Sequence, residues 1–261
     1  MTSTAASLAS RIAAPHASPI VASRRLLSTT KGQSENVFRI VLTGGPCSGK
    51  SSALSYLQKS LVPHGIPVYC APEAATLLNS AGAKYDPDGT HHEQHKAYQA
   101  SLCRLQLALE NNLTDIAASY HHNKQAVVIL CDRGVLDNKG YMSSELWQDV
   151  LASLGMEEAS ILEHYAGVIH MDTAAKGALE FYKSGDTVDD DGNPVSRQET
   201  PEQARALDDQ MWNVWQGHAH HYRVTNRKPD NNNNNKNTNT FDLKLQDTVR
   251  AVEQILKDSS S

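Results

Sequence analysis

The stretch VLTGGPCSGKSS, residues Val41–Ser52, decides how the rest of this 261-residue chain is interpreted. A short apolar run precedes it, and leucines with helical spacing follow it at Leu54, Leu57 and Leu61. Between these two segments lie three glycines, a proline and a lone lysine. The sequence therefore predicts a strand, a glycine-rich turn and a helix, in that order, with one positive charge at the turn.

Within this turn, the residues from Gly44 to Ser51 match the phosphate-binding pattern GxxxxGK[ST] at every position. Glycines leave room for backbone amides to converge on phosphate oxygens, and the N-terminus of the following helix favours an anion. In such a loop the lysine, Lys50, neutralises the phosphates and the hydroxyl of Ser51 binds Mg²⁺. The predicted nucleotide-binding set is Gly44, Gly45, Pro46, Cys47, Ser48, Gly49, Lys50 and Ser51. We therefore expect Mg²⁺ and ATP as cofactors, with GTP as the open alternative to ATP.

Apolar runs of strand length recur along the chain, and amphipathic segments separate them. The runs are Val37–Leu42, Ile66–Cys70, Ala126–Cys131, Gly167–Met171 and Tyr222–Thr225. Two further sets of residues have helical spacing, first Leu102, Leu105, Leu109, Leu113 and Ile116, and later Leu245, Val249, Val252 and Leu256. This alternation predicts an α/β fold in which helices cover both faces of a parallel sheet.

A loop and a helix start are predicted between the last two apolar runs. The segment Ser184–Ser196 is rich in glycine, aspartate and proline, so we expect an irregular, mobile loop there. Downstream, Thr200 is suited to cap a helix, with Pro201 at the first helical position and Gln203 placed to close a capping box. This helix should continue to about Gln216.

Acidic residues at strand ends are the candidates for a second contact to Mg²⁺. The run VVILCDRG, Val127–Gly134, places Asp132 at the carboxyl end of a strand, where the ligand sites of open α/β sheets lie. Asp172 follows a similar run and is the alternative, but Arg133 beside Asp132 adds a cation that pairs with phosphate. A role as an ordinary turn or cap residue stays open for Asp132. The predicted magnesium ligands are therefore Ser51 and Asp132.

Two further features fit phosphoryl transfer. In CAPEAAT, Cys70–Thr76, the carboxylate of Glu73 ends the second predicted strand and could accept a proton from a substrate hydroxyl. An acid that stabilises a helix N-terminus is an equally good interpretation of Glu73. Lys183, Arg197 and Arg205 flank the predicted loop, as the charges of a closing lid would. For any one of them alone, a solvated surface charge is the simpler interpretation.

The composition argues against several classes of protein. The net charge of −5 argues against broad binding to nucleic acid or to an anionic membrane. No stretch approaches the ~20 apolar residues that a membrane-spanning helix needs. The four cysteines are far apart and form no CxxC pair, which suits reduced thiols better than disulfides or zinc. We expect a nucleoside triphosphate and a small-molecule acceptor as partners, with no nucleic acid and no transmembrane segment.

The first 34 residues differ from the rest of the chain. Their only charged residues are basic, namely Arg11, Arg24, Arg25 and Lys31. Together with abundant serine and threonine, this composition predicts a transit peptide and a mitochondrial protein, and a disordered tail on a cytoplasmic protein is the alternative. Residues 35–261 are then expected to form one P-loop kinase-like domain, with a disordered asparagine-rich insertion at residues 230–240.

Several of these segments occur together in one known family. VLTGGPCSGKS, PEAAT, LQLALE, ILCDRG, FYK, ARALD and WQGH lie in family order between Phe38 and Leu256. In these segments the chain resembles the NadR-like P-loop domain of AAA type, which bacterial nicotinamide riboside kinases share with the TRPL translocation defect protein. The resemblance implies a P-loop NTPase fold, a three-layer α/β/α sandwich with a five-stranded parallel sheet in the order 2-3-1-4-5 and a nucleoside-kinase-like lid.

The same resemblance implies roles for individual residues. Glu73 resembles the catalytic base of P-loop nucleoside kinases, Asp132 the acid on the magnesium side, and Arg133 a contact to phosphate or hydroxyl. Arg197 and Arg205 resemble the arginines of the lid.

The sequence leaves two functions open. The first is an ATP-dependent kinase, a transferase that moves the γ-phosphoryl group to a hydroxyl of a small nucleoside-like acceptor. The second is a nucleotide-dependent regulatory module, with GTP as a candidate ligand, in trafficking or phosphoinositide contact. The sequence lacks the guanine-binding motif NKxD, which argues against GTP in the second function. Asn138 and Lys139 are followed by Gly140 and Tyr141, so tyrosine stands where the motif has aspartate.

Overall fold

Five apolar segments pair into one parallel sheet. They are β1 (Val37–Thr43), β2 (Val68–Ala71), β3 (Val127–Asp132), β4 (Gly167–Met171) and β7 (His221–Val224), in the spatial order β2-β3-β1-β4-β7. The computed structural model describes residues 36–83, 91–121, 126–183, 185–188, 194–197, 199–227 and 240–259. Each predicted strand is present to within two residues of its expected bounds. The predicted α/β sandwich and the strand order 2-3-1-4-5 are confirmed.

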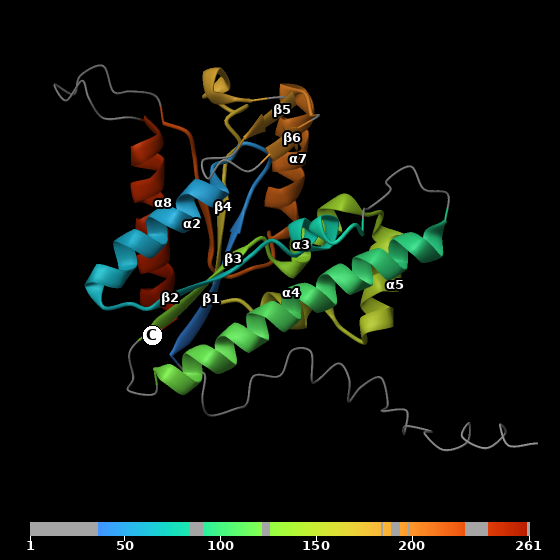
Figure 1. Ribbon diagram of the computed structural model, residues 1–261, viewed down its shortest axis with the longest axis horizontal. Coiled ribbons are helices and arrows are strands. Elements are labelled where there is room, and N and C mark those ends of the chain that lie inside the picture. Colours follow the sequence, from blue (N-terminus) through green and yellow to red (C-terminus); the bar gives the residue numbers. More distant parts are fainter. Residues whose placement is uncertain are drawn as a thin grey trace, which may run out of the picture.

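Helices cover both faces of this sheet, as Figure 1 shows. The α-helices are α2 (Lys50–Leu61), α3 (Ala74–Ser80), α4 (His92–Tyr120), α5 (Ser144–Leu154), α6 (Glu158–Leu162), α7 (Pro201–Val214) and α8 (Thr240–Asp258). Short 3₁₀ turns lie at η1 (Val62–His64), η2 (Val135–Tyr141) and η3 (Leu179–Phe181). Helices α2 and α8 pack together on one face, and α4 packs with α5 on the other.

The alternation of side chains along β1 shows how the two layers of core arise. Ile40 and Leu42 are fully buried among residues of α2 and α8, such as Leu57 and Val252. Val41, which points to the opposite face, is buried among residues of the α4 and α5 layer. Because helices cover both faces of this parallel strand, most of its residues are apolar. This apolar run is the pattern from which the strand was predicted.

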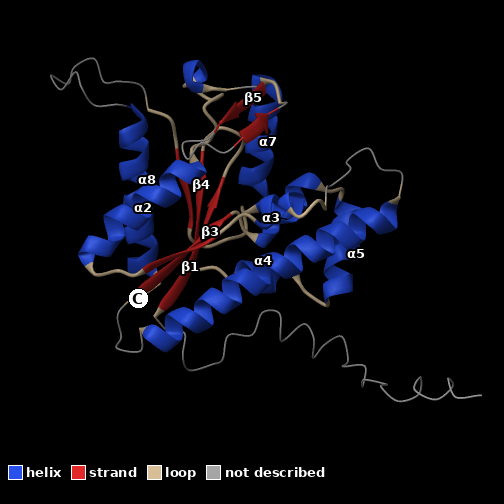
Figure 2. Cartoon of the chain, viewed as in Figure 1, coloured by secondary structure: helices blue, strands red, loops and turns tan. Residues whose placement is uncertain are grey.

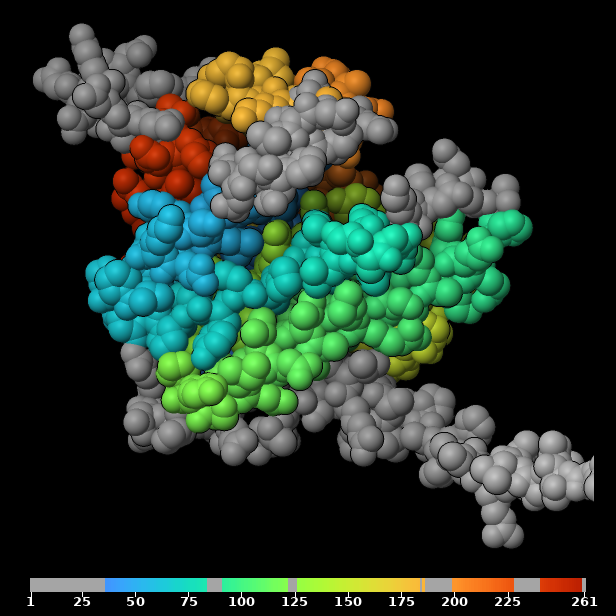
Figure 3. Space-filling model, viewed as in Figure 1, coloured from blue at the N-terminus to red at the C-terminus, as the bar shows by residue number. Residues whose placement is uncertain are grey.

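Helix α4 buries a different face from the one its leucines predicted. Leu102 is buried, but Leu105, Leu109 and Leu113 are only half-buried and Ile116 is exposed. The buried face carries Ala100, Leu102, Cys103, Leu107 and Ala117, and with them four polar side chains, namely Gln99, Gln106, Glu110 and Thr114. Three of these, Gln106, Glu110 and Thr114, are hydrogen-bonded inside the core, which removes most of the cost of burying them. Figure 3 shows α4 running beside α3 across the surface of the molecule.

The predicted irregular loop at Ser184–Ser196 is wrong in part, because it contains two short strands. They are β5 (Gly185–Val188) and β6 (Pro194–Arg197), which pair antiparallel and form a second small sheet (Figure 2). Backbone pairing runs from Gly185 opposite Arg197 to Val188 opposite Pro194. The β-branched residues Thr187, Val188 and Val195 favour these two strands.

Two predictions from composition fall on other parts of the chain. The proposed transit segment, residues 1–34, and residues 230–239 of the asparagine-rich stretch lie outside the described residues. Thr240, the last residue of that stretch, begins α8. Within the described ranges, no helix has the length and apolar character needed to cross a membrane.

The capping box predicted at the start of α7 is confirmed. The Oγ1 of Thr200 accepts a hydrogen bond from the amide of Gln203 at 3.3 Å, and the Gln203 Oε1 accepts one from the Thr200 amide at 2.8 Å. Pro201 stands at the first helical position. The helix ends at Val214 rather than near Gln216.

Removal of this cap should weaken the fold measurably. We expect Thr200→Ala to lower the free energy of unfolding by about 1 kcal/mol, because the Gln203 amide in the first turn loses its acceptor, the Thr200 Oγ1. Thr200→Ser keeps the hydroxyl and is the matched control, with a loss of a few tenths of that value. Urea unfolding monitored by circular dichroism measures both. Equal stability of Thr200→Ala and the parent would contradict the assignment of the cap.

Candidate active site

The carboxyl ends of the parallel strands meet at one edge of the sheet, and the turn after β1 lies there. Separate hydrogen bonds fix the orientation of its peptide groups. The amide of Gly45 donates to Oδ1 of Asp208 on α7 at 2.8 Å. The Nζ of Lys50 donates to the carbonyls of Gly44 and Gly45, both at 3.2 Å, and to Oγ of Ser48 at 3.1 Å. The first half of the turn therefore directs its carbonyls toward the lysine and its amide outward.

The second half of the turn has the opposite orientation. The carbonyl of Pro46 accepts from the hydroxyl of Thr173, and that of Cys47 accepts from the amide of Ala174 at 3.0 Å. The carbonyl of Ser48 accepts from Nζ of Lys244, a buried residue of α8, at 2.8 Å. These three carbonyls point away from Lys50. Because a carbonyl and the next amide along a trans peptide chain point in opposite directions, the amides that follow them face the inside of the turn.

This arrangement makes an anion-binding concavity. Helix α2 begins directly after the turn, and its N-cap residue, Gly49, has a left-handed conformation with φ of 86°. Neither a capping side chain nor an acidic residue in the first turn neutralises this helix N-terminus within the described chain. Inward-facing amides and a helix N-terminus together favour a phosphate group.

Packing gives a second reason for the paired glycines. Gly44 has φ of 137°, and a Cβ there would collide with the carbonyl of Met171 on β4. A Cβ on Gly45 would lie 2.8 Å from Cβ of Asp208. The glycines thus let β4 and α7 approach the turn closely enough for the bond between the Gly45 amide and Asp208 to form.

Charged groups that follow β2 and stand at the end of β3 act on Lys50. Burial and the neighbouring Arg133 lower the pKa of Lys50 from 10.5 to about 8, while Asp132 and Glu73 act in the opposite direction. The same carboxylates and guanidinium that the sequence singled out therefore lie within electrostatic reach of the phosphate-loop lysine. A phosphate group bound in the turn would favour the charged form of this lysine.

Glu73 forms an ion pair with Arg133. The Arg133 Nε donates to Oε1 of Glu73 at 2.7 Å, and the Thr76 hydroxyl donates to Oε2 at 2.6 Å. Burial raises the pKa of Glu73, but Arg133 and the Thr76 hydrogen bond outweigh it, so the pKa is lowered overall. Glu73 is the N-cap residue of α3, yet its side chain forms no capping hydrogen bond. The carboxylate binds the Arg133 guanidinium and the Thr76 hydroxyl rather than the helix backbone.

Arg133 also has capacity left for a ligand. Its Nη1 is buried and has no hydrogen-bond partner in the described part of the chain. On its other side the guanidinium carbon lies 5.8 Å from the centre of the Tyr141 ring, which is about half exposed. A buried guanidinium N–H without a partner is costly, so a hydrogen-bond acceptor at this position would be stabilising.

The two candidate acids for Mg²⁺ have different surroundings. Burial raises the pKa of Asp132, and the charge of Lys50 opposes the rise. Asp172 instead accepts from Nε of Arg223 on β7 at 2.7 Å. Asp132 therefore shares the surroundings of Lys50, whereas Asp172 is neutralised by an arginine of the edge strand.

Of the two predicted lid arginines, Arg197 and Arg205, the structure describes the side chain of Arg205. Arg205 on α7 donates to the carbonyl of Ala175 at 3.0 Å and pairs with Glu202 at 2.7 Å. It thus binds the first turn after β4 and not the phosphate loop. The backbone of Arg197 belongs to β6, and its side chain lies outside what the structure describes.

Two buried acids that the sequence did not single out hold the site together. Asp137 accepts from Oγ1 of Thr43 at 2.5 Å, from the amide of Gly134 at 3.0 Å and from Nε1 of Trp215 at 2.9 Å. Asp208 accepts from the amides of Gly45 and Thr173 and from Nζ of Lys176. The spacing of Ala204, Asp208 and Met211 was the available signal, because it places an acid on the buried face of α7.

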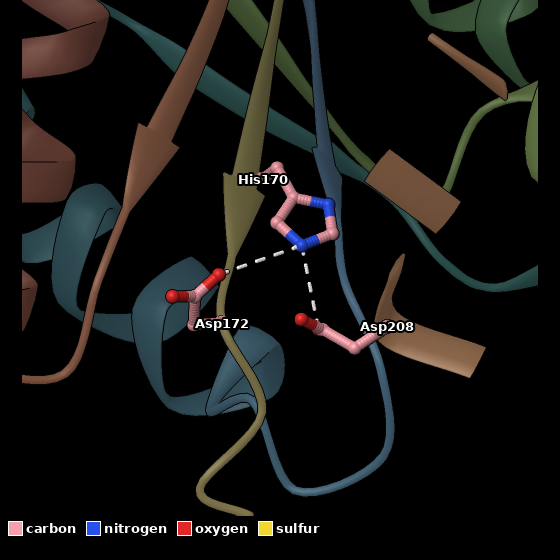
Figure 4. Close-up of side chains that lie close together, drawn as sticks. All are labelled: His170, Asp172 and Asp208. Atoms are coloured by element: carbon pink, nitrogen blue, oxygen red, sulfur yellow. Dashed lines mark ion pairs between the residues drawn. The ribbon is translucent and has the colours of Figure 1, made fainter. Parts of the chain in front are cut away.

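His170 lies between Asp172 and Asp208 beneath the turn (Figure 4). Its Nε2 is 3.3 Å from Oδ1 of Asp208 and 3.8 Å from Oδ1 of Asp172, and all three residues are buried. These atoms are close enough together to share a metal ion. However, Lys176 and Arg223 already pair with the two carboxylates at 2.7 Å each. A further divalent charge would be uncompensated, so we interpret the cluster as an internal charge network that supports the turn.

Comparison with known proteins agrees with this geometry. A family model described as an AAA domain matches residues 39–230. No curated protein sequence matches the chain. Among solved structures, the NadR protein in complex with NAD and AMP-PNP matches with a TM-score of 0.51 and 11% identity, over 86% of this chain and 51% of that one. This chain therefore spans about half the length of the NadR protein.

Two further solved structures have lower TM-scores. The thymidylate kinase from Ehrlichia chaffeensis matches with a TM-score of 0.47 and 12% identity, over 83% of this chain and 99% of that one. The Mycobacterium tuberculosis APS kinase CysC, as a Cys-to-Ala variant, matches with a TM-score of 0.34 and 14% identity, over 84% and 98%. The family match and the fold shared with NadR confirm the predicted NadR-like P-loop domain and its kinase-like fold.

The role of the Asp208 charge beside the turn is testable. We expect Asp208→Asn to lower the free energy of unfolding by about 3 kcal/mol, because Lys176 and His170 lose the charge that they face. Asp209→Asn is the matched control. Asp209 also contacts Lys176, at 2.5 Å, but its side chain is 61% exposed, so its loss should cost less than about 1 kcal/mol. Chemical unfolding measures both, and equal stability of the two variants would contradict the bracing role.

Proposed function

We propose that this chain, which belongs to the AAA-domain family matched over residues 39–230, is a Mg²⁺-dependent kinase acting on a small nucleoside-like acceptor. It would transfer the γ-phosphoryl group of ATP to an acceptor hydroxyl. One observation carries the proposal: the phosphate-binding turn, Asp132 and the pair of Glu73 with Arg133 all lie within electrostatic reach of Lys50. A phosphate site alone serves many activities, but a carboxylate paired with an arginine beside it suits transfer to a hydroxyl.

The turn would hold the nucleotide. The inward-facing amides after Pro46, Cys47 and Ser48 donate to phosphate oxygens, and Lys50 moves from the carbonyls it now contacts to the terminal phosphates. Ser51 and Asp132 are the residues that would hold Mg²⁺, since a hydroxyl and a carboxylate are ligands this ion prefers. When bound, the ion neutralises charge on the phosphates.

Glu73 would orient and deprotonate the acceptor. As the acceptor oxygen forms its bond to the γ-phosphorus, the bond from that phosphorus to the bridging oxygen breaks and ADP leaves. The acceptor proton passes to Glu73, whose oxygens each retain a lone pair beyond the bonds from Arg133 and Thr76. The unpartnered Nη1 of Arg133 would hold an oxygen of the acceptor or of the transferring group.

The lid and the cellular location complete the proposal. Arg197 and Arg205 would stabilise the transferring charge when β5, β6 and the start of α7 close over the site.

The basic, serine-rich residues 1–34 support a mitochondrial transit peptide. A fluorescent fusion of the full chain should enter mitochondria, and a fusion lacking residues 1–34 should not.

The central experiment separates binding from turnover. Glu73→Gln should leave the affinity for a non-hydrolysable ATP analogue within about threefold and lower kcat by about 100-fold or more, because the proton acceptor is lost. Thr76→Val removes one hydrogen bond to Glu73 but keeps the carboxylate, so it should retain most of the turnover. Lys50→Ala should abolish nucleotide binding. Calorimetry with ATP and GTP analogues and a coupled assay over a nucleoside panel provide the measurements.

Two outcomes would contradict this proposal, the first in the assignment of the base and the second in the kinase activity itself. Full turnover by Glu73→Gln would remove the assigned base. Nucleotide hydrolysis at the same rate with every acceptor, or with none, would favour the regulatory binding module instead.

The pKa of Lys50 gives the nucleotide affinity a defined pH dependence. Its pKa is about 8 in the free protein, and a bound phosphate raises it. Binding therefore takes up a proton above pH 8, so affinity is constant below about pH 7.5 and falls by up to about tenfold per unit above pH 8. In Lys50→Arg the guanidinium stays charged, so the part of this decline that Lys50 causes should disappear. Lys244, whose pKa burial also lowers to about 8, is present in both proteins, so the comparison isolates Lys50.

A further inference from the structure

The backbone of Arg133 has a conformation that arginine rarely adopts. Its φ of 68° lies in the left-handed region, which is unfavourable for residues with a Cβ. The amide of Arg133 donates to the carbonyl of Leu42 at 3.0 Å, which fixes one side of the residue to β1. Strained residues of this kind persist only where their surroundings hold them, so contacts on the other side of Arg133 must also hold its backbone in place.

Gln106 of α4 provides the contact on that other side. Its Nε2 donates to the carbonyl of Arg133 at 3.1 Å and to Oε1 of Glu110 at 2.7 Å. Both N–H bonds of the amide are therefore used, and the side chain is only 4% exposed. Gln106 and Glu110 are the second and last residues of LQLALE, a segment to which the proposed chemistry gives no role.

Glu110 extends this contact into a clamp around Gly134. Its fully buried carboxylate accepts from the hydroxyl of Tyr165 at 3.1 Å and lies 2.9 Å from Nε2 of His164. The same Tyr165 oxygen accepts from the amide of Val135 at 3.0 Å. One buried network thus holds the carbonyl before Gly134 and the amide after it.

We propose that Gln106 is a positioning residue, which fixes Arg133 in its left-handed conformation so that the guanidinium meets Glu73. Without the Gln106 bond, the Arg133 carbonyl would lose its buried partner. The backbone would then relax toward negative φ, which redirects the side chain. The consequence for turnover rests on the proposed kinase function, but the consequence for the ion pair does not.

The test compares two glutamines of the same buried face of α4. Gln106→Met keeps the side-chain length and removes both donors. Gln99→Met makes the same change at a residue that is 3% exposed and whose Oε1 has no hydrogen-bond partner among the described residues. The main readout is the ¹⁵N-edited NMR signal of the Arg133 Nε–H, assigned by its loss in Arg133→Lys, because it reports the bond to Glu73 without any substrate.

We expect Gln106→Met to shift or broaden this signal while Gln99→Met leaves it unchanged. In the kinase assay, Gln106→Met should lower kcat by about 10- to 100-fold with the affinity for the ATP analogue within about twofold. An unchanged Arg133 signal in Gln106→Met would overturn the proposal. If the parent shows no turnover with any acceptor, the kinase function fails, but the NMR comparison still decides the positioning role.

A milder variant, Tyr165→Phe, still tests the proposal if Gln106→Met fails to fold. Tyr165→Phe removes the acceptor for the Val135 amide and one bond to Glu110, and it leaves Gln106 in place. The proposal predicts a smaller shift of the same Arg133 signal in this variant. No shift in Tyr165→Phe would show that the network does not act on Arg133 and would count against the clamp.

Discussion

The hydrogen bond from the Gly45 amide to Asp208 is the interaction on which the site depends. It turns one peptide group outward, and the bonds from Thr173, Ala174 and Lys244 then turn the next three carbonyls away from Lys50. The shape of the turn is thus imposed from outside, by the residues after β4, by α7 and by α8. Such preorganisation lowers the free energy that binding must spend on ordering the loop.

Charge balance at the sheet edge follows from the same arrangement. Lys50 and Arg133 stand opposite Asp132 and Glu73, and Asp137 is a third carboxylate within electrostatic reach. Burial disfavours the charged forms of Lys50 and of Asp132, whereas direct hydrogen bonds lower the pKa of Glu73. In the kinase proposed above, a triphosphate with Mg²⁺ would enter a region rich in partly compensated charges, which suits transient stabilisation of a transferring phosphoryl group.

The sequence predicted what depends on local pattern. The turn, the strands and the cap at Thr200 are encoded within a few residues of each other, so motif and periodicity locate them. The bracing residues are different, because Asp208 acts on a turn 163 residues earlier and Gln106 acts on Arg133 across the core. Their importance lies in contacts that spacing does not show. The burial of polar side chains on α4 was missed for the same reason, since their hydrogen-bond partners come from β1, from the residue after β3 and from the loop before β4.

The contact between Lys244 and Ser48 has a consequence for how the molecule is made. These residues are 196 positions apart, and the ammonium that completes the turn comes from the last helix that the structure describes. A nascent chain emerging from the ribosome exposes the glycine-rich turn early, but it lacks this partner until α8 has been synthesised. The full set of hydrogen bonds around the turn therefore forms only after α8 has been synthesised, so the shape of the turn depends on long-range folding as well as on its own local sequence.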